Sequence, residues 1–422
     1  MSDYLKWFNE RCGEGLAAYL AALAFFLPLS PTVTNYLLVP LPLLLLWGWR
    51  QKQLAQLTER RAAGLVAAFA LVGAVSLAVA PRFFESAYNY VHLMGRYVLI
   101  YFAVLLGVQT RRQAYHVVGA VLASSLLVSA YGIYQYFHGV AMLTSECVDV
   151  AQFPTLKTRA FSTLQNPNLL AAFLLMVMSL AGGIFFSTQR LRIRLPLLLV
   201  GAVALLCLIF TYSRGAWVSL VVITVICGFL FSRRLLWVLG PALGIIGFFA
   251  RDLVVARVAS IFNPTDTSAT LRMALWESTW SMIADHPVTG IGWGAYQFVY
   301  PAYDFFIQDP GTIIFHAHNL YLNIAAELGL PGIALFLLAL LAHVAIGFRV
   351  LRQTRLPEQR GIVMGLIAVV IGVLVNGMTD FALFNIEISM LFWLFVALIA
   401  VLARCEAQAA ISEEKPHIGI SV

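Results

Sequence analysis

Long apolar runs, separated by short polar or charged stretches, constrain this chain more than any other feature of its sequence. With 61% hydrophobic and 11% charged residues, the chain is far more apolar than a soluble globular protein. A bilayer core takes about 20 apolar residues per helix, so we expect an all-α polytopic membrane protein with about 12 transmembrane helices. The predicted spans lie near residues 15–30, 33–49, 62–80, 92–108, 114–137, 167–186, 195–212, 216–232, 235–250, 320–348, 361–380 and 386–403.

These runs divide the chain into four parts. Residues 1–250 hold the first nine predicted helices, and residues 251–319 form one long external loop that contains a helix. Residues 320–403 hold the last three predicted helices, and residues 404–422 form a polar cytoplasmic tail. The N-terminal run lacks a small-residue cleavage site, so we expect it to be retained as a signal anchor.

The net charge of +7 could indicate a nucleic-acid partner, but the basic residues follow membrane topology instead. Cytoplasmic loops of polytopic proteins carry an excess of Lys and Arg. Placing both termini in the cytoplasm puts most basic residues inside, so we expect no nucleic-acid partner. The basic residues left outside are Arg82, Arg96, Lys157, Arg159, Arg214, Arg251, Arg257 and Arg272.

The candidate site lies where the long loop meets the tenth run, around His316, His318 and Tyr321. Histidines two residues apart do not share a helix face, which argues against a helical zinc site, and no metal is expected. An imidazole near its ordinary pKa of ~6.5 can accept a proton from a sugar hydroxyl. We expect His318, at the head of the helix, to be the base and His316 to be a supporting contact. The alternative for each is a hydrogen-bonded structural histidine.

Arg214 occupies the turn between the seventh and eighth runs, and Gly215 eases the close turn there. A charge held at that depth needs an anionic partner, and the adjoining turn has no acidic residue. This favours a ligand contact over an ion pair with a distant carboxylate.

Residues 266–285 of the loop predict an amphipathic helix that ends before Pro287. Arg272 and Trp276 share one face of it, and this pair suits both phosphate and sugar, since guanidinium pairs with phosphate and indole stacks on sugar rings. A membrane-anchoring face is the alternative. We expect a flexible turn at Gly290–Gly294, which lacks the features of a nucleotide loop.

Several further charged residues have open roles. Arg159 is either an anion contact near the helix that begins around Asn168 or an ordinary loop arginine, and Arg82 either meets lipid phosphate or snorkels. Asp380, at the outer end of the eleventh run, is a candidate partner for an outer arginine or histidine. Glu327, inside an apolar run, either marks a site or bonds a neighbouring helix.

Three motifs together resemble the O-antigen ligase and polymerase superfamily of bacterial envelopes. They are His318-Asn-Leu-Tyr-Leu-Asn-Ile-Ala-Ala-Glu-Leu-Gly-Leu-Pro-Gly332, Thr211-Tyr-Ser-Arg-Gly-Ala-Trp217 and Leu271-Arg-Met-Ala-Leu-Trp276. The resemblance implies a multi-pass inner-membrane enzyme with a periplasmic site that uses no cofactor. Its donor would be an undecaprenyl diphosphate-linked glycan and its acceptor the lipid A core.

The same resemblance implies that His318, Arg214 and Arg272 are catalytic. Arg159, Arg82, His316, Tyr321, Trp276 and Asp380 are candidate substrate-binding residues. The long loop and its Arg-Trp helix favour a ligase over a polymerase or a protein-glycosylating relative. A lipid-linked glycan flippase is the rival of another class, but transporters place ionisable residues at mid-membrane and often show repeats, whereas here they cluster at one face.

Overall fold

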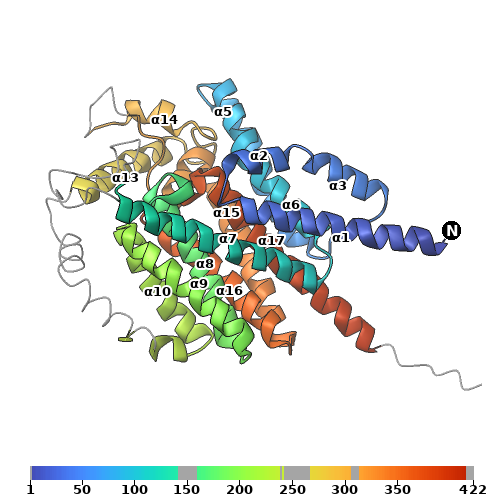
Figure 1. The fold of residues 1–422 in the computed structure, drawn as a ribbon. Coiled ribbons are helices and arrows are strands. Elements are labelled where there is room, and N and C mark those ends of the chain that lie inside the picture. The colour runs from blue at the N-terminus through green and yellow to red at the C-terminus, as the bar shows by residue number, and fades with distance from the viewer. Residues whose placement is uncertain (1, 141–158, 238–239, 242–266, 306–312, 415–422) are drawn as a thin grey trace, which may run out of the picture.

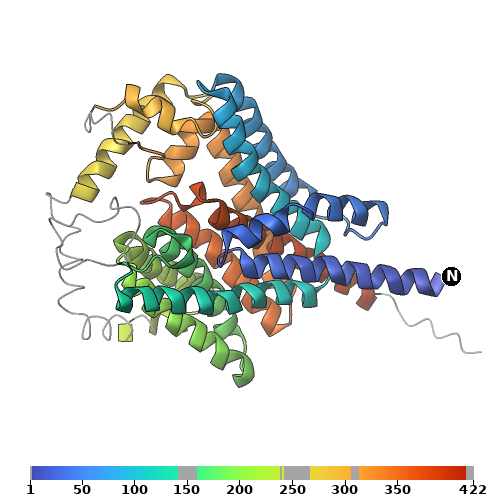
Figure 2. The same cartoon turned by 45° about the horizontal axis from the view of Figure 1, so that its top comes forward.

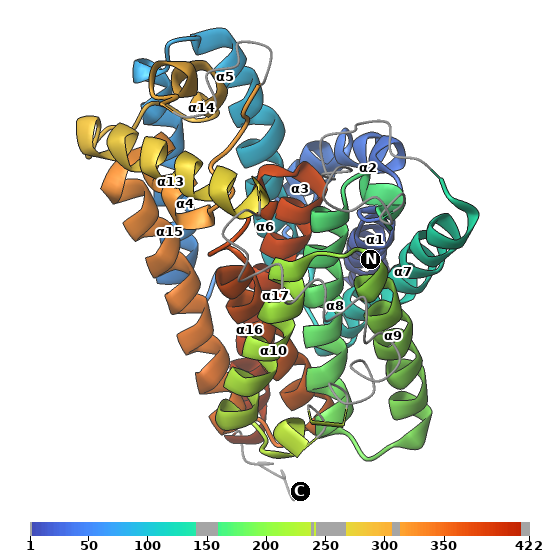
Figure 3. The same ribbon diagram turned by 90° about the vertical axis from the view of Figure 1, so that its left-hand side faces the viewer.

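The computed structural model describes residues 2–140, 159–237, 240–241, 267–305 and 313–414, and these ranges contain helices but no strand. Long helices run alongside one another, and short ones gather over one end of the bundle (Figures 1 and 3). The protein is an all-α polytopic membrane protein, as the apolar runs predict.

Nine segments among the described residues are long and apolar enough to cross a bilayer. They are α2–α3 (Pro31–Leu38 and Leu41–Arg50), α4 with η1 (Arg60–Ser76 and Leu77–Val79), α5–η2–α6 (Phe83–Asn89, Tyr90–Gly95 and Arg96–Gly107), α7 (Arg111–His138), α8 (Pro167–Ser187), α9 (Leu191–Phe210), α15 (Leu320–Gln353), α16 (Pro357–Asn376) and most of α17 (Ile386–Glu414).

Two shorter apolar helices account for the first and eighth predicted runs. They are the second half of α1 (Ser2–Phe26) and α10 (Arg214–Leu230). The ninth predicted run, 235–250, lies largely outside the described residues. Every other predicted run therefore has a helix, although several are shorter or longer than predicted.

The fourth span begins earlier than the sequence indicated. The prediction places it at 92–108, but α5, the π-helical turn η2 and α6 form one run from Phe83 to Gly107. Arg96 lies inside this run, and its guanidinium donates to the side-chain oxygen of Asn35 at 2.7 Å.

The core surrounds α17, whose apolar residues are almost all buried. Trp393 of α17 stacks on Tyr97 of α6 with ring centroids 5.5 Å apart. Small residues let α8 and α16 meet backbone to backbone, because a Cβ at Gly183 would lie 2.4 Å from the nitrogen of Gly365. This contact packs the first half of α16 on the second half of α8.

A cap layer covers one end of the bundle (Figure 2). It consists of α5, α13 (Thr267–Asp285), α14 (Tyr296–Val299), η6 (Tyr300–Ala302) and the loops that join them. The helix predicted in the long loop is confirmed from Thr267 onward. Leu275, Ser278 and Met282, on one face of it, are buried, whereas Leu271 on the same face is exposed.

The turn at Gly290–Gly294 is fixed rather than flexible, contrary to expectation. Helix α15 breaks at Gly329, where φ is +68°, and the break frees carbonyl groups of the preceding turn. The Ile291 and Gly292 N–H groups donate to the carbonyls of Ala326 and Glu327 at 2.9 and 3.0 Å. The Glu327 carboxylate accepts the Gly294 N–H at 3.0 Å. Glu327 therefore holds the cap layer on α15.

Candidate active site

The loop Ile313–Asn319 carries both candidate histidines to the beginning of α15. Asn319 is the N-cap, and its side chain accepts the N–H groups of Tyr321 and Leu322. His318 precedes the cap with φ of +49°, so it does not head the helix as predicted. A non-glycine residue in this region is uncommon and must be held by its surroundings.

The carboxylate of Asp380 is the partner of His318. His318 Nδ1 lies 3.3 Å from Asp380 Oδ1, and the side chains are 34% and 12% exposed. Burial alone would raise the pKa of Asp380, but the hydrogen bond with His318 and the nearby charges, Arg272 among them, lower it to about 2. Asp380 is therefore a carboxylate at neutral pH and accepts a hydrogen bond from Nδ1–H, which leaves Nε2 as the proton acceptor.

His316 supports His318 from within the protein. Its Nδ1 accepts the backbone N–H of His318 at 3.2 Å, which helps to hold the left-handed conformation. Its ring packs on Phe384 at 4.2 Å and against the His318 ring at 4.3 Å. Burial, followed by the charges of His318 and Arg272, lowers the pKa of His316 to about 3, so this ring is neutral at neutral pH.

Helix α13 is attached directly to the histidine loop. The indole N–H of Trp276 donates to the carbonyl of Ala317 at 3.1 Å, between the two histidines. Arg272 lies one turn before Trp276 and is partly buried. Its charge acts on the pKa values of both His316 and Asp380, so it lies within electrostatic reach of the pair.

Arg214 is the first residue of α10, and the beginning of this helix lies against the segment that leads to Asp380. The next residue, Gly215, is so close to the chain before Asp380 that a Cβ there would lie 2.8 Å from Thr379 Oγ1. One turn further, the Ser219 hydroxyl donates to Asn376 Oδ1 at 3.4 Å. The outer end of α10 is thereby packed on the segment that carries Asp380.

Arg159 is buried beside the turn that leads to Arg214. Its Nε donates to the carbonyl of Thr211 at 2.7 Å and its Nη2 to Asn168 Oδ1 at 3.1 Å. The sequence suggested Asn168 as the cap of α8, but Asn166 caps it by accepting the Asn168 and Leu169 N–H groups. Asn168 instead accepts from Arg159.

The contacts of Arg82 and Tyr321 within the described ranges are with residues other than His318 and Asp380. Arg82 is largely exposed, forms a 3.7 Å ion pair with Glu85 and lies over the Phe298 ring in the cap layer. The Tyr321 hydroxyl donates to the carbonyl of Leu374 at 2.7 Å, which ties α15 to α16.

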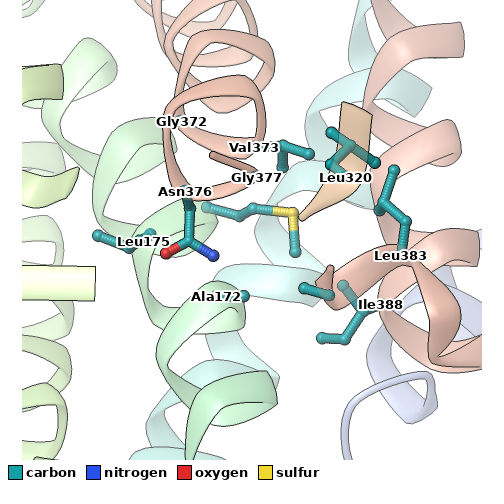
Figure 4. Close-up of a pocket in the computed structure, with 11 residues that line it drawn as sticks. Ala172, Leu175, Leu320, Gly372, Val373, Asn376, Gly377, Leu383 and Ile388 are labelled. Carbon is teal, nitrogen blue, oxygen red and sulfur yellow. The ribbon is translucent and has the colours of Figure 1, made fainter. Parts of the chain in front are cut away.

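A small apolar cavity lies next to the histidine loop, among α8, the end of α16, η7 (Ala382–Phe384) and the beginnings of α15 and α17 (Figure 4). The Asn376 amide is the polar group in its lining. Asn376 and Thr379 were missed as site neighbours. Asn376 had a visible signal, a polar side chain near the end of an apolar run, but Thr379 had none.

Within the described ranges, no three His, Cys, Asp or Glu side chains are grouped so that they could hold a metal ion. The candidate site thus contains the His318–Asp380 pair with Arg272 within electrostatic reach, and α10, which begins at Arg214, packs on the segment that carries Asp380.

Residues 199–337 match the family model described as O-antigen ligase. The matched segment contains Arg214, Arg272 and His318, whereas Arg159 and Asp380 lie outside it. The match confirms the resemblance to the O-antigen ligase and polymerase superfamily that the three motifs indicated. No curated protein matches the chain.

Proposed function

We propose that this protein is a membrane glycosyltransferase that moves O-antigen glycan from undecaprenyl diphosphate to the lipid A core oligosaccharide. The observation that carries the proposal is the His318–Asp380 pair, 3.3 Å apart, on which α10 and α13 converge. The match of residues 199–337 to the O-antigen ligase family supports the same chemistry. With both termini cytoplasmic, the cap layer and the site face the periplasm of an inner-membrane protein.

In this proposal, Arg214 and Arg272 bind the donor diphosphate. Breaking the bond between the anomeric carbon and phosphate leaves charge on the leaving diphosphate, which guanidinium groups at a sheltered interface stabilise. Arg214 stands at the N-terminus of α10, where Ser213 makes no side-chain capping bond. The helix dipole there adds to the attraction for an anion.

His318 is the general base. Nε2 takes the proton of the acceptor hydroxyl while that oxygen attacks the anomeric carbon from the face opposite the diphosphate. The bond to the phosphate oxygen breaks, its electron pair stays on the diphosphate, and the configuration inverts. Asp380 holds Nδ1–H and stabilises the imidazolium as it forms. Trp276, Tyr321 and Arg82 are proposed to contact the glycan or lipid around this centre.

A flippase places its ionisable groups at the middle of the membrane. The buried His343 of α15 lies within a span, but both its ring nitrogens are used, one with the Tyr101 hydroxyl at 2.9 Å and one with the Ala339 carbonyl at 2.7 Å. This arrangement favours a structural role for His343, and with it an enzyme over a transporter.

The test is to delete the gene and analyse the envelope glycolipids. A lipid A core without polymer, together with accumulated carrier-linked polymer, is the result expected for a ligase. A core that bears a single repeat would instead identify a polymerase.

Complementation then tests the residues. His318→Ala and Arg214→Ala should reach the membrane at normal levels yet fail to restore attachment, whereas His286→Ala, on an exposed cap-layer histidine, should restore it. Wild-type attachment by either of the first two variants would refute the assigned roles.

A further inference from the structure

The turn that delivers Arg214 is held in a strained conformation. Tyr212, the second residue after α9, has φ of +51° and is 4% exposed. The left-handed region is unfavourable for a non-glycine residue, so the surrounding contacts must hold Tyr212 there.

Arg159 holds one side of this turn. Besides the bond from its Nε to the Thr211 carbonyl at 2.7 Å, the next residue, Ala160, donates its N–H to the Phe210 carbonyl at 2.9 Å. The Asn168 side chain, at the start of α8, accepts from Nη2 of the same guanidinium at 3.1 Å. The guanidinium thus joins α8 to the end of α9 through two groups at once.

Tyr136 holds the other side. The Tyr136 and Tyr212 hydroxyl oxygens are 2.9 Å apart, and the Tyr136 ring stacks on Phe210 with centroids 4.1 Å apart and planes within 5°. Tyr136 belongs to α7, so two separate parts of the chain converge on Phe210, Thr211 and Tyr212, shortly before Arg214.

We infer that Arg159 and Tyr136 are positioning residues, which fix the Thr211–Ser213 turn and thereby the placement of Arg214 against the Asp380 segment. The inference rests on the proposed function, in which Arg214 binds the diphosphate. Arg214 follows the strained residue by two positions, and Gly215 leaves no room beside Thr379, so a shift of the turn moves Arg214 relative to the site. Arg159 acts through the Thr211 carbonyl and not by contact with the donor.

The test is a double-mutant cycle on the affinity for undecaprenyl diphosphate, measured as Kd with the purified full chain in lipid nanodiscs. Tyr136→Phe removes one hydroxyl and keeps the stacked ring, so it should weaken binding about three- to tenfold. Tyr134→Phe, on the same helix with an exposed side chain, is the matched control and should change Kd less than twofold. Arg159→Ala should weaken binding about tenfold or more, since a hydrogen bond from a charged group is lost.

In an Arg214→Ala background, both changes should alter Kd less than twofold, because their effect passes through Arg214. If Arg159→Ala weakens the Arg214→Ala protein as much as it weakens the wild type, Arg159 contacts the diphosphate itself and the inference is overturned. Arg159→Lys is a second variant at the same position, included in case Arg159→Ala fails to fold. It keeps the charge but cannot bridge both acceptors, so it should bind like Arg159→Ala, and wild-type affinity would also overturn the inference.

Failure of the proposed function would look different. Arg214→Ala would then bind undecaprenyl diphosphate as tightly as the wild type does, whatever the effect of the other substitutions.

Discussion

Replacing Asp380 with asparagine should lower the turnover of glycan transfer and leave the KM for the donor nearly unchanged. The carboxylate accepts from His318 Nδ1 at 3.3 Å, so it fixes the tautomer that leaves Nε2 free for the acceptor proton. Asparagine has almost the same shape, but it carries no charge to stabilise the imidazolium that forms during the reaction. The lost interaction belongs to the transition state, so kcat should fall rather than substrate affinity.

The size of the effect follows from the geometry. At 3.3 Å and an effective dielectric constant of about 20, the attraction between carboxylate and imidazolium is roughly 5 kcal/mol. This is an upper bound, because a third of the His318 side chain is exposed and water screens the pair. A hydrogen bond to a charged group contributes about 1.5–3 kcal/mol, which corresponds to a fall in kcat of about ten- to 150-fold.

The assay is transfer from undecaprenyl diphosphate-linked glycan to lipid A core in proteoliposomes, with kcat and KM measured separately. Asp285→Asn is the matched control, because this cap-layer carboxylate accepts the Tyr303 hydroxyl at 2.8 Å and has no proposed role in catalysis. Its kcat should stay within twofold of wild type. An Asp380→Asn enzyme with wild-type kcat would refute the orienting role, and an increase confined to KM would assign Asp380 to substrate binding.

Three further changes test the structure around the pair. Gly215→Ala should lower transfer because its Cβ meets Thr379 Oγ1 at 2.8 Å, and adding Thr379→Ala should restore activity; no rescue would mean that the contact is unimportant. Gly329→Ala should lower the melting temperature by several degrees, because φ is +68° and the Cβ would lie 2.3 Å from the Val288 carbonyl oxygen, whereas Gly64→Ala, with open space around it, should not. The folded-state pKa of His316, about 3, is below the ordinary 6.5, so the unfolded chain binds more protons between these values and stability should fall as pH drops through this window. In His316→Gln, the loss of melting temperature between pH 7.5 and 5.0 should be smaller, and an unchanged loss would show that His316 does not cause it.

Much of the fold could be predicted from the sequence, because the bilayer sets the length and the apolar composition of every span. Any span needs a long apolar helix, so the runs at 167–186 and 361–380 predicted α8 and α16 to within a few residues, apart from the last turn of the second. The breaks between spans were less predictable. The fourth span was predicted to begin at residue 92, yet its helical run begins at Phe83, and Arg96 inside it donates to Asn35 on another helix.

The candidate site, too, was predictable from the sequence only in part. Charged and titratable residues are costly near a membrane, so Arg214, His318 and Asp380 stood out in the chain by their type and depth alone. Which of them pair depends on how α10, α15 and α16 pack, because the two partners that meet, His318 and Asp380, are 62 positions apart in the chain. The sequence left the partner of Asp380 open between an arginine and a histidine, and only the fold brought it to His318.

The sequence by itself determined the all-α membrane architecture and the kinds of residue at the site, because hydrophobicity and the cost of burying charge act locally along the chain. Only the tertiary structure decided that Glu327 holds a glycine turn, that Arg159 bonds the Thr211 carbonyl and that His318 precedes its helix in a left-handed conformation. The first two depend on an N–H or carbonyl group supplied by a distant segment, and no local pattern specifies which distant group that will be.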